Sequence, residues 1–581
     1  MSFLKRTYIK SEIISCPTPN CWDIVAFLLV AAILILLGYS ANMMMTKFDV
    51  GQQSSHISLD PVMLPYYALR TVLRMLIAMI FSLLFTFIFG TWAAKSRCAE
   101  RIIIPLIDIL QSVPVLGFLT ITIAAFVALF HGSFLGPECA ALFAIFTAQV
   151  WNIALSFYQS LRTIPNDLQE VAVMLQLSAW QRFWRVEVPF AIPSLLWNIM
   201  ISMSGSWIFL VASEAITVAG HDIMLQGIGS YISLAIKCAD KMAVIYVIVT
   251  MIVVIALYDQ LLFRPLVAWA EKFNAEVDVG ENEAQSWILN LFHRTRFLRF
   301  VGTYCSLLGN TIINCRIFGH PSLRKSVKYH HLLRRFFNII GNTLVILAFM
   351  TSFYLLMRFI LSEADWTEVF HVLYLGFITG LRVTILLILS SFIWVPIGVW
   401  IGLRPNISQV VQPIIQFLAA FPANLLFPIV VILIIRFSLN VNIWTSPLMI
   451  LGAQWYILFN VIAGTMALPK NLHHAVDILN VKGWIWWKRF ILPGIFPHYI
   501  TGAITTAGSS WNTSIIAESV NWGGKCLHAT GLGAYIVSIS QQGDFPRLTL
   551  AIMVMSLYVL VFNYGLWRPL YRLAEERFQI K

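Results

Sequence analysis

The 581-residue sequence has little charge. Asp, Glu, Lys and Arg make up 11% of its residues, whereas a soluble protein carries roughly 25%. Hydrophobic residues make up 59%, and the mean hydropathy is +0.79. A chain with so few charges cannot cover its surface with polar groups, so a soluble fold is excluded. The composition predicts an all-α polytopic membrane protein.

The motifs of catalysis and of metal binding are also missing. The eight cysteines are scattered, and no CxxC or Cys/His group has the spacing of metal ligands. The phosphate-binding pattern GxxxxGK[ST] does not occur, and no catalytic triad is recognisable. The sequence therefore predicts no catalytic residue, no metal, no cofactor and no enzymatic activity. If the protein uses ATP, the ATPase must be a separate chain.

A formal net charge of +12 would suit a nucleic-acid-binding protein if the cations formed one patch. They lie instead at the ends of apolar runs and in a stretch between residues 266 and 337, where the positive-inside rule places them. This distribution predicts no nucleic-acid partner. It also predicts that both termini and the central stretch are cytoplasmic.

Apolar runs long enough to cross a bilayer recur along the chain. The first, from Ile24 to about Met45, is too long for a signal-peptide core, so we expect an uncleaved helix. The whole pattern predicts about 12 transmembrane helices in two sets of six. It divides the chain into an N-terminal segment with the first helix and an outer loop (1–65), a first domain (66–265), a basic cytoplasmic linker (266–337), a seventh helix with its outer loop (338–371), a second domain (372–569) and a cytoplasmic tail (570–581). Within the linker, residues 287–308 could lie on the inner leaflet or serve as a plain tether.

The two domains are copies of one another. Trp151 and Trp455 lie 304 residues apart, and so do Pro189 and Pro493. Closer to the N-terminus the separation between equivalent residues is 308, as between Arg74 and Arg382. The change of register falls in the expected outer loops near 131–139 and 437–444, where insertions are tolerated. We therefore expect two parallel six-helix repeats related by an axis along the membrane normal.

Each repeat contains a polar island between apolar runs, at residues 170–193 and 474–497. In the first copy, Asn166 or Asp167 is expected to cap a helix that starts after Pro165. A second helix should begin at Ser178, because Ser178 and Gln181 have the spacing of a capping box.

These two stretches resemble the cytoplasmic EAA loop of binding-protein-dependent ABC importer permeases of type I. The pattern is Glu-Ala-Ala, a Gly three residues later, and a hydrophobic-Pro pair about a dozen residues further on. The first copy departs from it at Gln176, where the family usually has Gly, and the second copy departs more. The resemblance implies that these loops dock on the ATPase. The residues that it marks are Glu170, Ala172, Gln176, Ser178, Gln181 and Pro189, and in the second copy His474, Asn480, Lys482, Gly483 and Pro493. An ordinary amphipathic loop at the interface is the alternative.

Several ionisable or amide side chains recur inside the predicted spans. Arg74 and Arg382 could face a buried partner or a water-filled path, or extend to the outer interface. Glu214 and Glu518 could cap a helix or line the exit of a substrate path, and two acids would disfavour an anion beside them. The glycines beside Tyr231 and its counterpart predict tight turns in the outer segments. The candidate pore or gate residues are Arg74, Trp207, Glu214, Arg382, Trp511, Asn512 and Glu518.

The resemblance implies a fused, double-length permease of the type I importer fold. Its expected partners are two ABC ATPase subunits, a periplasmic or lipid-anchored solute-binding protein, membrane lipid and a small solute, in the bacterial inner membrane. The stretch 111–118 is most similar to the nitrate, sulfonate, taurine and bicarbonate branch, which suggests an anion such as nitrate, bicarbonate or a sulfonate. A major facilitator transporter is the alternative, but residues 95–101 lack its characteristic loop. An intramembrane enzyme would need clustered catalytic side chains at one depth, which the sequence lacks.

Overall fold

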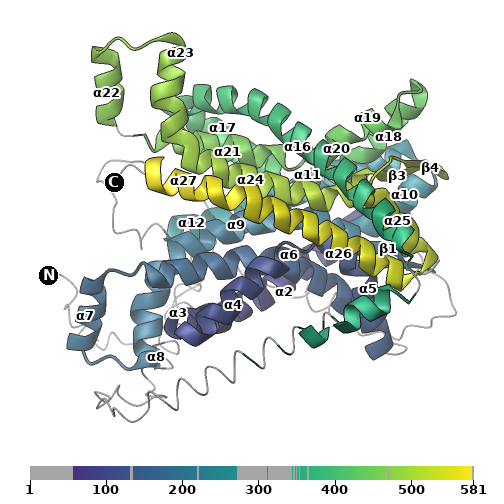
Figure 1. Cartoon of the computed structure of the whole chain (residues 1–581), viewed down its shortest axis with the longest axis horizontal. Helices are drawn as coiled ribbons and strands as arrows, with labels where there is room; N and C mark the ends of the chain where they lie inside the picture. Colours follow the sequence, from purple (N-terminus) through teal and green to yellow (C-terminus); the bar gives the residue numbers. More distant parts are fainter. Residues whose placement is uncertain are drawn as a thin grey trace, which may run out of the picture. The chain divides into compact units, whose positions relative to one another are not determined.

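A computed structural model describes residues 57–130, 135–218, 221–270, 365–468 and 470–578, with scattered positions between 310 and 362. Within these residues the structure is helical apart from two short hairpins (Figure 1). In this described part of the chain, six helices are long and apolar enough to cross a membrane, or up to nine if each bent pair is one span. The expected first span (24–45), most of the linker and most of the seventh span (338–360) lie outside the described residues.

The first repeat begins with one long span and a broken one. Its helices before the polar island are α2 (Leu64–Phe85), α3 (Thr91–Lys95), α4 (Arg97–Leu110), α5 (Val115–Leu129) and α6 (Leu135–Arg162). The polar island forms α7 (Asn166–Met174) and α8 (Ala179–Arg182), and α9 (Val188–Glu214) follows. A hairpin of β1 (Ala215–Val218) and β2 (His221–Met224) then leads to α10 (Ile228–Lys237), α11 (Lys241–Tyr258) and α12 (Arg264–Ala270).

The second repeat has the same order. Its helices before the polar island are α16 (Trp366–Gly402), α17 (Pro405–Ala420), α18 (Phe427–Arg436), α19 (Val441–Trp444), α20 (Ser446–Ile450) and α21 (Gln454–Met466). The island forms α22 (Lys470–Ile478) and α23 (Gly483–Trp486), followed by α24 (Leu492–Ala517). The hairpin of β3 (Ser519–Trp522) and β4 (Lys525–His528) leads to α25 (Leu532–Gln542), α26 (Phe545–Phe562) and α27 (Arg568–Phe578).

Irregular features recur at the 304-residue separation, which confirms the repeat inside the structure. Both hairpins are antiparallel and four residues deep, with Ala215 opposite Met224 in one and Ser519 opposite His528 in the other. A five-residue π-helical turn precedes α9 and another precedes α24. A second pair of π-helical turns, at 259–263 and 563–567, precedes α12 and α27.

The third span of each repeat is broken at a proline. α4 and α5 meet at an angle of 100° around Pro114, and their counterparts in the second repeat meet at 77° around Pro422. Proline disfavours the helical conformation of the residue before it and cannot donate a backbone hydrogen bond. The break turns the start of α5 toward the second repeat, where the candidate site lies.

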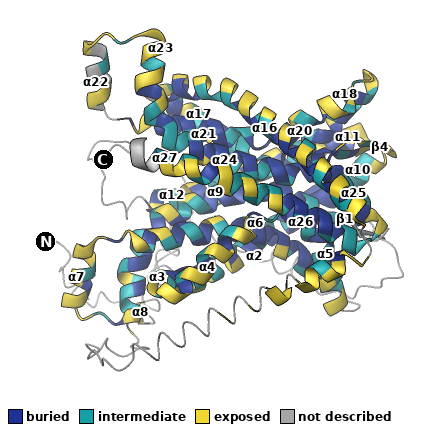
Figure 2. Cartoon of the chain, viewed as in Figure 1, coloured by how far each residue is buried: buried dark blue, intermediate teal, exposed yellow. Residues whose placement is uncertain are grey.

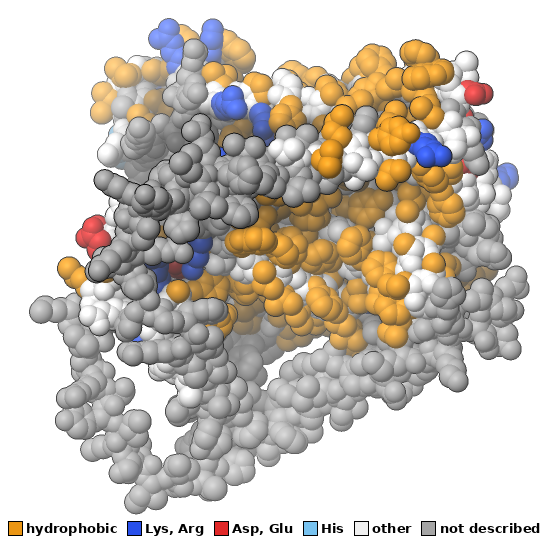
Figure 3. All heavy atoms as spheres, turned by 60° about the horizontal axis from the view of Figure 1, so that its bottom comes forward, with side chains coloured by type: hydrophobic (Ala, Val, Ile, Leu, Met, Phe, Trp, Pro, Cys, Tyr) orange, Lys and Arg blue, Asp and Glu red, His pale blue; other side chains and the backbone are white. Residues whose placement is uncertain are grey.

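The described surface is largely apolar, as lipid contact requires. In α2 the side chains of Ile80, Phe81 and Leu84 are exposed, and in α16 those of Phe392 and Ile393 are exposed. Figure 3 shows wide areas of hydrophobic side chains with few charged groups among them. The eleventh expected span, α24, forms a 26-residue helix but is not among the six strongly apolar helices.

The contacts divide the chain into two compact units, and each is described by itself. The first consists of residues 1–43, 163–196 and 258–325, and so contains α7 and α8. The second consists of 44–162, 197–257 and 326–581 and contains most of both repeats. In this second unit one hydrophobic core joins the repeats, because Val115 and Leu119 of α5 cluster with Ile515 of α24 and with Ile552 and Met555 of α26. α5 therefore packs into the second repeat.

Candidate functional site

The first polar island folds as two short helices joined by a left-handed turn. The capping box at Ser178 is confirmed: the Gln181 amide donates to Ser178 Oγ over 3.2 Å, and the Ser178 amide donates to Gln181 Oε1 over 3.0 Å. The cap expected from Asn166 or Asp167 is wrong, because α7 starts one residue earlier and its N-cap is Pro165, which makes no side-chain cap. Gln176 takes φ +50°, so it holds the left-handed turn for which glycine is the usual residue.

The second island keeps this turn with different residues. Asn480, the counterpart of Gln176, has φ +47°, and Gly483 has φ +65°. Lys482 stands where the first copy has its capping serine, and it makes no side-chain cap. Asparagine tolerates the left-handed conformation better than most residues. The two copies therefore share a backbone shape and differ in their polar contacts.

Both islands expose apolar side chains around the turn. Met174 is 81% exposed in the first copy, and its counterpart Ile478 is 83% exposed in the second. Leu175 and Leu479, one residue on, are exposed as well. Figure 2 shows α22 and α23 largely exposed, and in Figure 1 they project from the end of α21 and α24. Exposed apolar groups gathered around a turn between two short helices are typical of a protein interaction surface.

A buried ionic cluster ties the first repeat together where α9 meets its hairpin. Arg74 of α2 is 0% exposed and binds Glu138 of α6 through two hydrogen bonds of 2.6 and 2.7 Å. A third bond, 2.6 Å long, joins Arg74 to Glu214 at the end of α9. Glu214 also accepts from Thr71 over 2.8 Å and from the Gly229 amide of α10 over 2.7 Å. One carboxylate thus joins three helices.

The second repeat builds a looser version of this cluster. Glu518 accepts from Thr379 over 2.9 Å, from Arg382 over 3.2 Å and from the Gly533 amide over 2.6 Å. Asn442 takes the place of Glu138 and accepts from Arg382 over 3.2 Å. Arg382 is 14% exposed and has one acidic partner instead of two.

These contacts bear on the alternatives that the sequence left open. Arg74 faces buried partners, and the carboxylates of Glu214 and Glu518 each accept from an amide in the first turn of the following helix. The tight turns expected at the glycines are wrong: Gly227 is extended, with φ −179°, and Gly229 lies within α10. These glycines allow the start of α10 to approach the end of α9 closely. A Cβ on Gly227 would lie 2.3 Å from the carboxyl carbon of Glu214.

Two cavities lie between the repeats, on either side of a contact between α5 and α24. The cavity nearer the start of α24, which we call the island-side cavity, has a volume of about 420 Å³ and is lined by both repeats. The cavity nearer the hairpins, the hairpin-side cavity, measures about 320 Å³. Val115 and Asn512 line the first cavity, whereas Leu116 and Ile515 line the second.

The contact that separates the cavities includes one hydrogen bond across the repeats. Asn512 Oδ1 accepts from the Val115 amide over 2.8 Å, so a side chain of the second repeat caps the start of α5. A Cβ on Gly117 would lie 3.3 Å from Ile552 Cγ1, which shows how closely α5 approaches α26. Of the candidate gate residues, Asn512 lies at this contact and Trp511 lines the island-side cavity. Trp207 is buried and lines neither cavity.

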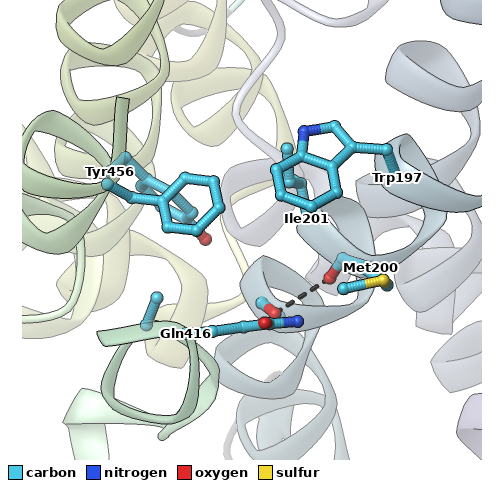
Figure 4. A pocket seen from close by; sticks show the side chains of 8 residues that line it. Trp197, Met200, Ile201, Gln416 and Tyr456 are labelled. Carbon is cyan, nitrogen blue, oxygen red and sulfur yellow. Dashed lines mark hydrogen bonds between the residues drawn. The ribbon is translucent and has the colours of Figure 1, made fainter. Parts of the chain in front are cut away.

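A smaller apolar pocket of about 30 Å³ adjoins the island-side cavity, and Tyr456 of α21 lines both. Figure 4 shows Tyr456 and Trp197 on opposite sides of this pocket, with Gln416 below. Tyr456, with its ring and hydroxyl, is 7% exposed. A Cβ on Gly205 would lie 3.1 Å from that hydroxyl.

Sequence reasoning missed Glu138, Thr71 and Tyr456. Glu138 is one of the few acids at the start of an apolar run, and that isolation was a signal that it needs a buried partner. The sequence gives no sign that Tyr456 lines a cavity, because its neighbours come from the other repeat. The ion pair of Asp108 with Arg568, 2.6 Å long and also across the repeats, was missed for the same reason.

The chain matches the family model described as "Binding-protein-dependent transport system inner membrane component" twice, at residues 86–265 and 394–566. These matches cover more than half of the chain. The curated relatives include three permeases. The nitrate import permease NrtB of Leptolyngbya laminosa is 32% identical over 19% of this chain and 38% of its own length. The bicarbonate transport permease CmpB of Synechococcus elongatus is 26% identical over 28% of this chain and 56% of its own. The glycine betaine/carnitine permease GbuB of Listeria monocytogenes is 24% identical over 30% and 56%.

The matched segments thus span between about two fifths and just over half of the length of these relatives. Both family matches enclose a polar island and its left-handed turn, at Gln176 and Asn480. The repeats, the apolar helices and the family matches agree. The chain belongs to the binding-protein-dependent transport inner membrane components, the permeases of ABC importers, and is a membrane-embedded transport component rather than an enzyme.

Proposed function

We propose that this chain supplies the complete membrane-spanning part of an ABC importer. It moves a small polar solute from the periplasm to the cytoplasm by alternating access, driven by two ATPase subunits on separate chains. The observation that carries the proposal is the pair of islands, each of which presents exposed apolar side chains around a left-handed turn. In the bacterial inner membrane these islands and both termini face the cytoplasm.

The contacts between the repeats support the idea that one chain forms the whole pathway. Both cavities are lined by residues of both repeats, and α5 shares a core with α24 and α26. A major facilitator transporter also has two parallel halves, but it needs no ATPase and no docking islands. A solute-binding protein would deliver the solute on the side of the hairpins.

The relatives do not select one solute. Two are named for the anions nitrate and bicarbonate, and a third for glycine betaine and carnitine, which carry a quaternary ammonium group. The sequence favoured nitrate, bicarbonate or a sulfonate, and these anions remain the reference solutes for any transport assay.

Co-purification of the ATPase tests the proposal. The full chain is extracted from its host membranes in mild detergent, and the proteins that accompany it are identified by mass spectrometry. We expect an ABC ATPase with the unaltered chain and its loss with Met174→Asp, which places a charge on the exposed apolar surface of α7. Asn166→Asp adds the same charge at the exposed start of α7 and serves as the matched control. An unaltered chain that brings down no ATPase would refute the proposal, and equal losses in both variants would refute the role of the apolar surface.

A further inference from the structure

A further pocket opens beside the second polar island and shares no lining residue with the two cavities between the repeats. We call it the α16–α24 pocket, because most of its lining comes from these two helices. The turn before α24 and one residue of α27 complete it. Its volume is about 830 Å³. In Figure 1 the three helices lie close together, and α24 contacts both α16 and α27.

Two helical faces form the pocket. In α16 the lining positions between Ile388 and Val395 follow the three- and four-residue spacing of one helical face. The lining positions of α24 between Leu492 and Tyr499 repeat that spacing. The pocket is therefore an elongated space between two helices rather than a gap left by one side chain.

The pocket opens on a surface that suits lipid. Phe392 of its lining is 76% exposed, whereas Ile495 is 1% exposed and forms part of its floor. Leu389 and Ile393, on either side of Phe392 in α16, are exposed as well. An apolar surface of this kind faces the hydrocarbon of the bilayer. An occupant of the pocket therefore enters from the membrane.

The inner part of the pocket does not suit water. Its two hydroxyl groups, those of Ser391 and Tyr499, hydrogen-bond one another over 3.0 Å. Water is held in a buried space only where it finds two to four polar partners. Hydrocarbon meets the remaining apolar side chains without losing any hydrogen bond. An acyl chain is the apolar material that the bilayer supplies.

A cation and two indole rings lie at the island end of the pocket. Lys488 is exposed and, within the described residues, is the one charged side chain of the lining. Trp484 and Trp487 come from the same short stretch. Tryptophan side chains favour the level of the lipid headgroups, and lysine there attracts anionic lipids. Since every phospholipid offers an acyl chain, the cation is the group that selects among them.

The polar groups of the pocket are particular to the second repeat. The equivalent residues of the first repeat, at separations of 304 and 308, carry neither a charge nor a hydroxyl group. Trp184, Leu83 and Leu195 stand in the places of Lys488, Ser391 and Tyr499. The same lipid selectivity is therefore not expected of the first repeat.

We propose that the α16–α24 pocket binds one phospholipid with an anionic headgroup. Its acyl chain lies between α16 and α24, and its phosphate lies at Lys488. The inference takes from the proposed function only the placement of the islands on the cytoplasmic side, which assigns the lipid to the inner leaflet.

Native mass spectrometry of the full chain tests this site. The chain is reconstituted in nanodiscs of equal parts phosphatidylglycerol and phosphatidylethanolamine with the same acyl chains, and is then released into mild detergent. We expect one retained phosphatidylglycerol per chain, in excess over phosphatidylethanolamine. Lys488→Gln should lower the ratio of the two retained lipids about fivefold, the effect of one cation beside a headgroup. Val395→Phe puts a larger side chain into the pocket and should lower the retention of both lipids.

Arg489→Gln is the matched control, because Arg489 is the next residue, is exposed and does not line the pocket. It should lower the lipid ratio less than Lys488→Gln does. Equal reductions would show general attraction to a basic surface and overturn the site, as would equal retention of both lipids by the unaltered chain. Unchanged retention in Val395→Phe would place the lipid elsewhere. A chain that co-purifies with its ATPase but retains no phosphatidylglycerol would refute the lipid site and leave the permease function intact.

Discussion

At the scale of single residues, the two repeats differ at the equivalent arginines Arg74 and Arg382. Arg74 is enclosed by two carboxylates and has no exposed surface, whereas Arg382 has one carboxylate and an amide and is partly exposed. A buried ion pair is strongly destabilising when one partner is removed, because the other charge stays behind. The same substitution should therefore have unequal consequences in the two repeats.

We predict that Arg74→Gln destabilises the folded chain by about 3 to 5 kcal/mol, since it leaves Glu138 and Glu214 buried without a cation. Arg382→Gln should cost less. The measurement is the unfolding midpoint of each variant in the same detergent. Arg74→Gln combined with Glu138→Gln should recover part of the loss. Equal midpoints for the two single variants would contradict the account.

The islands allow a second comparison between equivalent residues. Glu170 and His474 occupy matching positions on α7 and α22, and both are exposed. The resemblance gives Glu170 the role of contacting the ATPase, and the second copy has lost that carboxylate. We predict that Glu170→Ala lowers transport-coupled ATP hydrolysis more than His474→Ala does. The check is the solute-stimulated ATPase rate of the purified complex, and equal reductions would contradict the asymmetry.

At the scale of elements, each hairpin and the helix after it depend on one close approach. A Cβ on Gly533 would lie 2.5 Å from the Ser514 carbonyl oxygen of α24, a distance that real side chains do not adopt. α25 can therefore rest on α24 only because position 533 has no side chain. The Glu518 cap strengthens the same junction, since its carboxylate accepts from the Gly533 amide.

Gly533→Ala should accordingly destabilise the chain by about 1 to 3 kcal/mol, the usual effect of overpacking a close contact. Gly565→Ala is the matched control, because nothing lies within 4 Å of the Cβ that it would add. Its midpoint should stay the same or rise slightly, because alanine has the higher helix propensity. A midpoint for Gly533→Ala equal to that of the control would show that α25 does not depend on this approach.

At the scale of the whole molecule, the repeat could be predicted from the sequence because prolines, tryptophans and arginines recur at fixed separations in apolar runs. The capping box could be predicted because it depends on residues three apart. The hairpins could not be predicted, because their strands are four residues long and too short to display a recognisable alternation of apolar and polar residues. The cavities and the place of Tyr456 beside them could not be predicted either, since they arise from contacts between residues of different repeats, such as Val115 and Asn512, which are 397 positions apart.

The size of the assembled transporter tests the central claim, that one chain forms the whole permease. The complex is purified from host membranes through the full chain, and its mass is measured by native mass spectrometry. The account predicts one copy of this chain with two copies of an ABC ATPase, because the two islands offer two docking surfaces and both cavities are lined within one chain. Two copies of the chain in the complex, or a complex without an ATPase, would contradict it.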